Sequence, residues 1–396
     1  MAYAAEAPSP EPDGYRRLSV GDPAPWFQQA TSGSPQFQLD LAAGRYMVLC
    51  FLMGAGDPAG QRALELVTEN RRLFDDEKLS FFGVTINWRD QYEGRTRESL
   101  PGVRFFWDFD LAASRLYGAV PADAVPGVIN VRRRWFVLDP TLRIVATLRL
   151  QKDGGEHPAL LEILRNLPPI SAFAGGETAP PVLSLPNVFE PDLCRRLIAA
   201  FETHGGRESG SLVQVGDQTI PVHDHSHKRR LDHLLDDWAL IADVKRRIQR
   251  RVAPEMAKAF QFQATQMERH LVGCYEVGGH FSPHRDNTTA VTEHRRFAVS
   301  LNLNDDYDGG EICFPEYGRR RYRPAAGSAL VFSCSLLHGV SPVTRGRRYV
   351  FLPFLHDDAA ARVLEKNHGH AAAADQATPP PSPLSATRLA SMIARR

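Results

Sequence analysis

The hydrophobic pattern in the first half of the chain switches between short apolar runs and segments with helical spacing. Residues 46–52 are almost continuously apolar, which is typical of a buried strand. In the next segment, Ala63, Leu66 and Val67 fall on one face of a helix. The predicted strands cover residues 46–52, 79–86, 135–139 and 144–150, and the predicted helices cover residues 58–74, 111–117 and 157–167. Strands that alternate with helices predict an α/β fold for residues 15–168.

The second half of the chain follows a different order. Helical spacing comes first, and short β-rich runs separated by turn signals then repeat. The predicted helices cover residues 191–202 and 238–260, and the predicted strands include residues 297–303, 311–314, 328–333 and 348–354. Many short strands after a helical preface predict a jelly-roll barrel with helices packed on one face.

Three segments of biased composition divide the chain. Residues 1–14 are rich in Ala, Pro and acidic side chains and are expected to be disordered. Paired prolines around Gly-Gly predict a linker at residues 169–181. The Ala-rich and Pro-rich segment 361–396 predicts a mobile tail. Because 396 residues are too many for one ordinary core, we expect two domains, at residues 15–168 and 182–360.

Composition and charge narrow the class of protein. The net charge of +1 gives no reason to expect a nucleic acid or an anionic membrane as partner. The five cysteines are odd in number and form no Cys-x-x-Cys pair, which predicts a reduced protein of the cytoplasm. Neither a secretory signal nor a membrane span is expected, because no stretch approaches 18 apolar residues. Solvated faces are expected for the basic clusters 228–230, 246–247, 250–251 and 319–321.

Candidate chemistry gathers in the second half. His284 and Asp286 stand two residues apart, and a further histidine, His338, follows in a later β-rich segment. Two histidines and one carboxylate on one face of a metal leave other positions open, which is the arrangement of non-haem Fe(II) oxygenases. Arg348 could hold the carboxylate of an organic acid with its planar fork. Strand alternation sends Arg347 to the opposite face, and the spacing favours Arg348 for this role.

Several other polar residues are weaker candidates. His223, His225 and His227 form a rival metal cluster, although their polar surroundings favour a flexible loop or a border of the substrate entrance. Arg296 and Asn302 lie on predicted barrel strands and could contact a co-substrate or a substrate.

Residues 274–354 resemble the Fe(II)/2-oxoglutarate dioxygenases, and most of all their prolyl 4-hydroxylase branch. The matching elements are Tyr275-x-x-Gly278, His284-x-Asp286, Asp308-Gly-Gly-Glu311-x-x-Phe314, Pro324-x-x-Gly327-x-x-Leu330-x-Phe332 and His338-x-x-x-Pro342-Val343-x-x-Gly346-x-Arg348. The resemblance implies a double-stranded β-helix in which His284, Asp286 and His338 bind Fe(II). It also implies that Arg348 pairs with the distal carboxylate of 2-oxoglutarate and that Tyr275 supports the same carboxylate.

This resemblance implies an enzyme that uses Fe(II), 2-oxoglutarate and dioxygen, with ascorbate as a further candidate cofactor. It would hydroxylate a prolyl-like peptide or a small molecule and release succinate and CO2. The alternatives are a sensor that binds metal and 2-oxoglutarate without turnover, and an oxygenase that acts on nucleic acid. The near-zero charge and the short spacing from His338 to Arg348 speak against nucleic acid. Asp286 speaks against halogenation, which in related enzymes requires that this carboxylate be absent.

Residues 18–165 resemble the peroxiredoxins. The opening Val20-Gly-Asp-Pro-Ala-Pro-Trp-Phe27, the strand before residue 53 and the segment 133–139 carry the resemblance. The catalytic loop departs from the family, because Gly60 stands where Thr-Pro-x-Cys has its cysteine. Cys50 lies in a buried strand pattern, where a thiol is inert. We therefore expect a thioredoxin-fold domain without peroxidase activity, which would serve in docking, dimerisation or substrate presentation.

Overall fold

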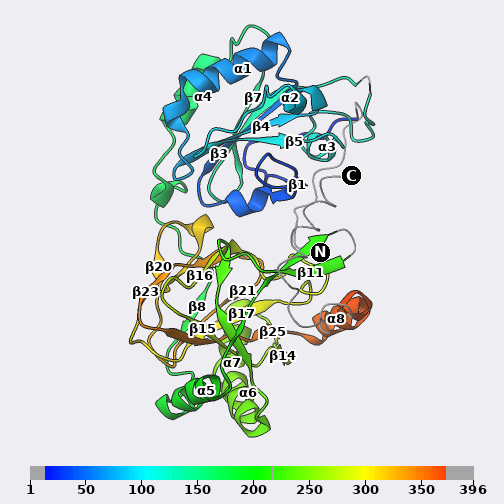
Figure 1. Ribbon diagram of the computed structural model, residues 1–396. Coiled ribbons are helices and arrows are strands. Elements are labelled where there is room, and N and C mark those ends of the chain that lie inside the picture. Colours follow the sequence, from blue (N-terminus) through cyan, green and yellow to red (C-terminus); the bar gives the residue numbers. More distant parts are fainter. Residues whose placement is uncertain (1–13, 128, 216–217, 372–396) are drawn as a thin grey trace.

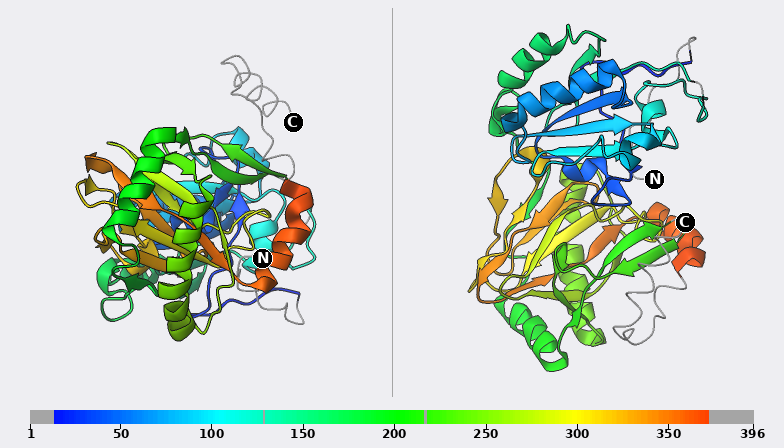
Figure 2. Two further views of the ribbon diagram at one scale, coloured as in Figure 1. Left: turned by 90° about the horizontal axis from the view of Figure 1, so that it is seen from below. Right: turned by 45° about the horizontal axis from the view of Figure 1, so that its top comes forward.

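The computed structural model describes residues 14–127, 129–215 and 218–371, which form two sheet-based units stacked on each other (Figure 1). The N-terminal unit sits at the end of the second unit opposite the helices α5 (Pro191–His204) and α6 (Trp238–Arg251). Figure 2 shows the same stacking from a second direction. Apart from Gly14, the segment predicted to be disordered lies outside the described residues.

The N-terminal unit is built on a five-stranded sheet with the order β5-β4-β3-β6-β7. The pairs β3–β4 and β4–β5 are parallel, whereas β6 runs antiparallel to both of its neighbours. The strands of the unit are β1 (Gln28–Gln29), β2 (Phe37–Gln38), β3 (Tyr46–Met53), β4 (Leu79–Thr85), β5 (Val103–Trp107), β6 (Arg134–Leu138) and β7 (Ile144–Arg149). The predicted α/β architecture, in which strands alternate with helices, is confirmed.

Alternation along β3 builds an apolar layer on each face of this sheet, and all eight residues of the strand are buried. One face packs against α1 and α4, which lie side by side in Figure 1. The other face packs against the 3₁₀-helix η1 (Leu39–Ala42) and reaches Leu337 of the second unit. The helices of the unit are α1 (Pro58–Glu69), η2 (Arg71–Leu73), α2 (Trp88–Tyr92), α3 (Ala112–Leu116) and α4 (His157–Arg165).

Several details of this unit differ from the sequence prediction, which also lacks β1, β2 and α2. The helix predicted over residues 58–74 is interrupted after Glu69 and continues as the short η2. Strand β5 is absent from the prediction because a charged residue, Arg104, interrupts its short apolar run. The structure compensates this charge, since the Arg104 guanidinium donates to both oxygens of Asp76 at 2.6 and 2.7 Å.

The second unit consists mainly of two antiparallel sheets. The larger sheet has nine strands, and the smaller has the order β12-β16-β22-β19-β20. The strands are β8 (Leu183–Leu185), β9 (Arg207–Glu208), β10 (Ser211–Val215), β11 (Gln218–Val222), β12 (Lys228–Arg229), β13 (Leu231–Leu234), β14 (Gln266–Glu268), β15 (Leu271–Tyr275), β16 (His280–His284), β17 (Phe297–Asn302), β18 (Asp308–Gly309), β19 (Ile312–Cys313), β20 (Arg321–Tyr322), β21 (Ala329–Ser333), β22 (His338–Val340), β23 (Val343–Arg345), β24 (Arg348–Phe351) and β25 (Phe354–His356). The predicted jelly roll is confirmed.

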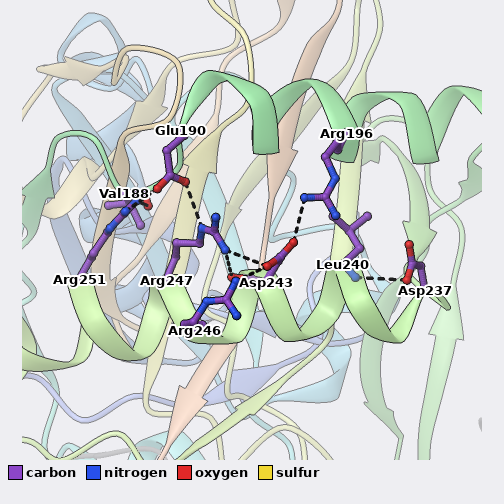
Figure 3. Close-up of polar contacts among 9 residues, drawn as sticks. All are labelled: Val188, Glu190, Arg196, Asp237, Leu240, Asp243, Arg246, Arg247 and Arg251. Atoms are coloured by element: carbon purple, nitrogen blue, oxygen red, sulfur yellow. Dashed lines mark hydrogen bonds and ion pairs between the residues drawn. The ribbon is translucent and has the colours of Figure 1, made fainter.

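Helices α5 and α6 lie side by side on the outer side of the larger sheet, and ion pairs join them (Figure 3). Glu190 at the start of α5 accepts from Arg247 at 3.0 Å and also pairs with Arg251. Asp243 on α6 accepts from Arg196 of α5 at 2.8 Å. These basic residues are therefore partly neutralised. The helix predicted over residues 238–260 is two helices, α6 and α7 (Ala253–Phe260), with a proline at the start of the second.

The segments at the two predicted boundaries contain regular structure. The predicted linker holds the short helix η3 (Ile170–Ala172), and Ile170 is buried against the N-terminal core. The predicted mobile tail begins within helix α8 (Asp358–Ala371), and its remainder lies outside the described residues. The amide of Asn367 ties this helix to the backbone oxygen of Ala290 at 2.9 Å.

The first turn of α1 has no room for the side chain of a nucleophile at residue 60. A Cβ atom added to Gly60 would lie 2.0 Å from the backbone oxygen of Gly54. Asp57 caps the helix by accepting from the Gly60 amide at 3.0 Å, and it also pairs with Arg133 at 2.6 Å. Cys50 is fully buried, and burial raises the pKa of its thiol well above the usual value. Neither position provides an accessible thiolate.

Introducing a thiol at the nucleophile position should not restore peroxide chemistry. Gly60→Cys is expected to lower the free energy of unfolding by about 1–3 kcal/mol, because the new side chain overpacks against the Gly54 backbone. The control Gln61→Cys places a thiol on the exposed neighbouring position. Denaturant unfolding and a coupled peroxide assay measure the two effects. Thiol-dependent turnover by the unmodified chain that Cys50→Ser abolishes would contradict this interpretation.

Candidate metal centre

The three predicted ligands meet where two strands of the smaller sheet lie side by side. His284 ends β16 and is paired in register with His338, which begins β22. Asp286 follows β16, and its backbone amide donates to the Cys334 oxygen at 2.9 Å. One ligand atom from each of the three residues lies within 4.8 Å of the other two. A set of two imidazoles and one carboxylate of this kind fits Fe(II) and leaves further coordination positions open.

Backbone carbonyls orient both imidazole rings. His284 Nδ1 lies 2.9 Å from the Ser282 oxygen, and His338 Nδ1 lies 3.0 Å from the Leu336 oxygen. Each Nδ1 therefore serves as the donor, and each Nε2 is left with its lone pair for a metal. The two Nε2 atoms face Asp286 at 3.4 and 3.5 Å. The rings are thus held in the tautomer that metal ligation requires.

Burial sets the protonation of this group. It lowers the pKa of His284 to about 4, and His338 acts in the same direction while Asp286 opposes it. Burial alone would raise the pKa of Asp286, but His338 and His284 outweigh it and hold that pKa well below its usual range. At neutral pH the site therefore presents a neutral His284 and an ionised Asp286.

Aromatic rings pack on both imidazoles. Phe281 stacks on His284 with ring centres 3.4 Å apart, and the ring centre of Phe332 lies 4.6 Å from that of His338.

The rival histidine cluster does not converge. Within residues 14–127, 129–215 and 218–371, the set His284, Asp286 and His338 is the one group with metal-ligand geometry. His225 instead pairs with Glu208 at 2.8 Å on the surface.

Arg348 is a buried cation on the larger sheet. Its residue exposure is 1%, and it donates to Asn302 Oδ1 at 3.0 Å and to Ser300 Oγ at 3.1 Å. Among the residues that the structure describes, Arg348 forms no ion pair with a carboxylate. A buried charge without a counter-ion is costly, so this guanidinium is suited to an anionic ligand. Arg347 faces outward and pairs with Glu276 at 3.2 Å.

Of the remaining candidates, Tyr275 and Asn302 lie beside Arg348, whereas Arg296 has a different partner. Tyr275 is paired in register with Arg348, whose guanidinium lies 5.3 Å from the centre of the Tyr275 ring. Asn302, a weaker candidate from the sequence, holds Arg348 in place. Arg296 instead donates to the backbone oxygen of Glu293 at 2.9 Å. Phe281 packs both on His284 and on the apolar cluster around Tyr275, so these side chains connect the cation with the ligands.

Sequence reasoning missed two buried basic residues beside this region. The prediction of a solvated face for residues 228–230 is wrong for Lys228 and Arg230, which are 7% and 8% exposed. Strand alternation explains the error, because the two lie two residues apart and share a face. Arg230 donates to both oxygens of Asp232 and, at 3.4 Å, to the Tyr275 hydroxyl. The Lys228 ammonium lies 4.8 Å from the Phe281 ring. The Arg-x-Asp spacing at residues 230–232 is the sequence signal that could have predicted the ion pair between Arg230 and Asp232.

Comparison with known proteins shows a family match for one segment of the second unit. Residues 269–356 match the family described as the 2OG-Fe(II) oxygenase superfamily. A PKHD-type hydroxylase of Synechococcus sp. is 36% identical over 86 residues, which cover 20% of this chain and 38% of that protein. The PKHD-type hydroxylase PiuC of Pseudomonas aeruginosa is 36% identical over 88 residues, which cover 20% of this chain and 39% of the relative. The chain thus spans about two fifths of the curated relatives it matches.

Solved structures resemble each half separately. The viral collagen prolyl hydroxylase of Paramecium Bursaria Chlorella virus-1 is 16% identical with a TM-score of 0.33, covering 44% of this chain and 94% of that one. A yeast mitochondrial 1-Cys peroxiredoxin is 19% identical with a TM-score of 0.32, covering 38% of this chain and 74% of that one.

The C-terminal region carries a 2OG-Fe(II) oxygenase domain, and the family match implies Fe(II), 2-oxoglutarate and dioxygen. The three converging residues lie inside the matched segment. In the described part of the chain, no helix is long and apolar enough to cross a membrane.

Removing either imidazole should abolish metal binding. His284→Ala and His338→Ala each delete one donor, so anaerobic Fe(II) titration is expected to change from one equivalent per chain to none. His280→Ala is the matched control, because His280 lies on the same strand but contacts the Gly278 and Ser226 backbone oxygens. Unchanged stoichiometry in both ligand variants would reject the assignment.

Proposed function

We propose that the chain is a dioxygenase dependent on Fe(II) and 2-oxoglutarate, which hydroxylates a prolyl-like peptide or a small molecule and releases succinate and CO2. The observation that carries the proposal is the convergence of His284, Asp286 and His338 within 4.8 Å, inside a segment that matches the oxygenase family. A buried arginine without a carboxylate partner among the described residues supports it.

Different residues of the chain would bind the metal and the co-substrate. His284, Asp286 and His338 would hold Fe(II) on one face and leave the remaining positions for 2-oxoglutarate and dioxygen. Bound iron and 2-oxoglutarate would supply the oxidising chemistry that hydroxylates the substrate. Arg348 would bind the distal carboxylate through its fork, while Asn302 and Ser300 fix the direction of the guanidinium. Tyr275 would line the same place from the neighbouring strand.

The substrate class is part of this proposal. The curated relatives are named hydroxylases, and a peptide or a small molecule agrees with that name. The sensor alternative differs in one observable, because a sensor would bind both ligands without forming succinate. Nucleic acid is disfavoured, since basic clusters of α6 are engaged in ion pairs and the net charge is +1.

Turnover tests the function directly. The Fe(II)-loaded protein is incubated with 2-oxoglutarate, dioxygen and panels of proline-containing peptides, free amino acids and cell metabolites, and succinate is measured. We expect at least one panel to raise succinate formation and to yield a product heavier by one oxygen atom. Tight binding of Fe(II) and 2-oxoglutarate without succinate in any panel would support the sensor instead.

Removing the Arg348 guanidinium should weaken the binding of 2-oxoglutarate. Arg348→Ala removes the counter-ion of a desolvated carboxylate, which typically costs roughly 2–5 kcal/mol. The expected loss in 2-oxoglutarate affinity is on the order of thirtyfold to several-thousandfold. Calorimetric titration of 2-oxoglutarate into the metal-loaded protein measures the effect, and Fe(II) binding is checked in each variant.

Arg347→Ala is the matched control for this measurement. Its side chain lies on the opposite face and pairs with Glu202 and Glu276, so the variant should keep its 2-oxoglutarate affinity. If Arg347→Ala is the impaired variant instead, Arg348 is not the carboxylate ligand.

A further inference from the structure

The residue between two metal ligands points into the interface with the N-terminal unit. His284 and Asp286 face the metal position, so alternation turns Arg285 to the outer side of the barrel. The Arg285 side chain is only 2% exposed, and both the N-terminal unit and the barrel contact it. Its guanidinium pairs with Asp40 of the 3₁₀-helix η1 at 2.9 Å.

Three further groups complete the surroundings of this guanidinium. Glu316 accepts two hydrogen bonds from it at 2.9 and 3.2 Å, and the Ser335 backbone oxygen accepts another. Trp26 of the N-terminal unit covers its face, with 4.4 Å from the guanidinium carbon to the ring centre. The Asp40 and Glu316 side chains are 8% and 10% exposed. Arg285 is therefore held by two carboxylates, one from each unit, in a site with little water.

The third ligand is tied to the same network. The backbone amide of Leu337, directly before His338, donates to Glu316 Oε2 at 3.1 Å. The Leu337 side chain is fully buried and belongs to the apolar cluster of the N-terminal unit. Glu316 thus bonds both to the neighbour of His284 and Asp286 and to the neighbour of His338. The N-terminal unit touches both ligand segments, through Asp40 on one and through its apolar core on the other.

We propose that the N-terminal unit is a positioning element of the metal centre, and that Asp40 acts through Arg285 and Glu316 to hold the two ligand segments at their mutual distance. This inference rests on the proposed function only in that the three residues bind metal. It gives the thioredoxin-like unit a role that needs no thiol. Asp40, Arg285 and Glu316 are positioning residues, because none of them supplies a donor atom to the metal.

The physical reason is the precision that a metal site demands. Ligand atoms must keep their positions to a fraction of an ångström, and groups that orient ligands typically account for roughly 10–100-fold in metal affinity. Packed interfaces transmit displacements, since they deform little. A shift of η1 would therefore move Arg285 and Leu337, and with them the backbone that carries His284, Asp286 and His338.

The first test removes the charge on the N-terminal side. Asp40→Asn in the full chain is expected to weaken Co(II) binding by about tenfold or more, within the range for outer groups of metal sites, and to alter the d–d absorption of the bound cobalt. Asp57→Asn is the matched control, because it also breaks an aspartate–arginine pair of the N-terminal unit, at 2.6 Å from Arg133, away from the interface. Circular dichroism confirms that each variant is folded at the titration temperature.

The second test pushes the units apart without changing a charge. A Cβ atom at Gly44 would lie 2.4 Å from the Pro315 side chain and 2.9 Å from its backbone, next to Glu316. Gly44→Ala should therefore also weaken Co(II) binding and alter its spectrum. Gly21→Ala is the matched control, because Gly21 has a similar φ of +94° compared with +92° at Gly44, and no atom lies within 4 Å of its added Cβ. Backbone strain is thus equal, and only the contact differs.

The outcomes separate this inference from the proposed function. If the unmodified chain does not bind Co(II), or if His284→Ala leaves its Co(II) binding unchanged, the proposed metal site itself is wrong. If that binding is present, and the folded Asp40→Asn and Gly44→Ala variants bind Co(II) with the affinity and spectrum of their controls, the positioning role is overturned. If one of the two variants does not fold, the other decides on the same criteria. Weaker binding in the folded interface variants, with both controls unchanged, supports the proposal.

Discussion

The site depends on one constraint, which is that two separate strand ends must be held side by side so that three donor atoms lie within 4.8 Å. His284 and His338 stand directly opposite each other in β16 and β22, but the register of these strands shifts just before this pair. Such an irregularity disrupts the ladder locally and re-aims side chains. Outside the ladder, backbone oxygens fix both imidazole rings, and the Glu316 carboxylate reaches both ligand segments.

The second feature of the site is the buried Arg348 guanidinium, which forms no ion pair with any described residue. Buried cations in proteins are normally paired, as Arg230 is with Asp232 and Arg285 is with Asp40 and Glu316. Arg348 donates to the neutral oxygens of Asn302 and Ser300, and it forms no ion pair within the described part of the chain. Under the proposed function, 2-oxoglutarate completes this arrangement. All three arginines are almost fully buried, so burial does not distinguish the structural arginines from Arg348, the proposed binding arginine. The presence or absence of a carboxylate partner among the described residues distinguishes them.

The N-terminal unit has a buried α/β sheet but no accessible thiolate at Cys50 or at residue 60. Asp57 and Arg133 pair where an accessible thiolate would be needed, and the backbone of Gly54 lies against residue 60. The opposite face of the same sheet carries the contact with the barrel, through η1 and the cluster that includes Leu337. A unit without a reactive thiol can still provide a rigid surface, because its stability resides in its buried sheet.

Much of this molecule could be predicted from the sequence. Apolar runs and helical spacing predicted both sheet-based units, and the ordered motifs around His284, Asp286, His338 and Arg348 predicted the candidate site, whose three proposed metal ligands converge in the structure. These predictions could be made because periodicity and motif spacing are local properties of the chain. Burial of Lys228 and Arg230, the missing counter-ion of Arg348 and the contact of Arg285 with Asp40 were decided by the tertiary structure alone. Asp40 and Arg285 lie 245 residues apart, and only the packing of the two units brings their charges together.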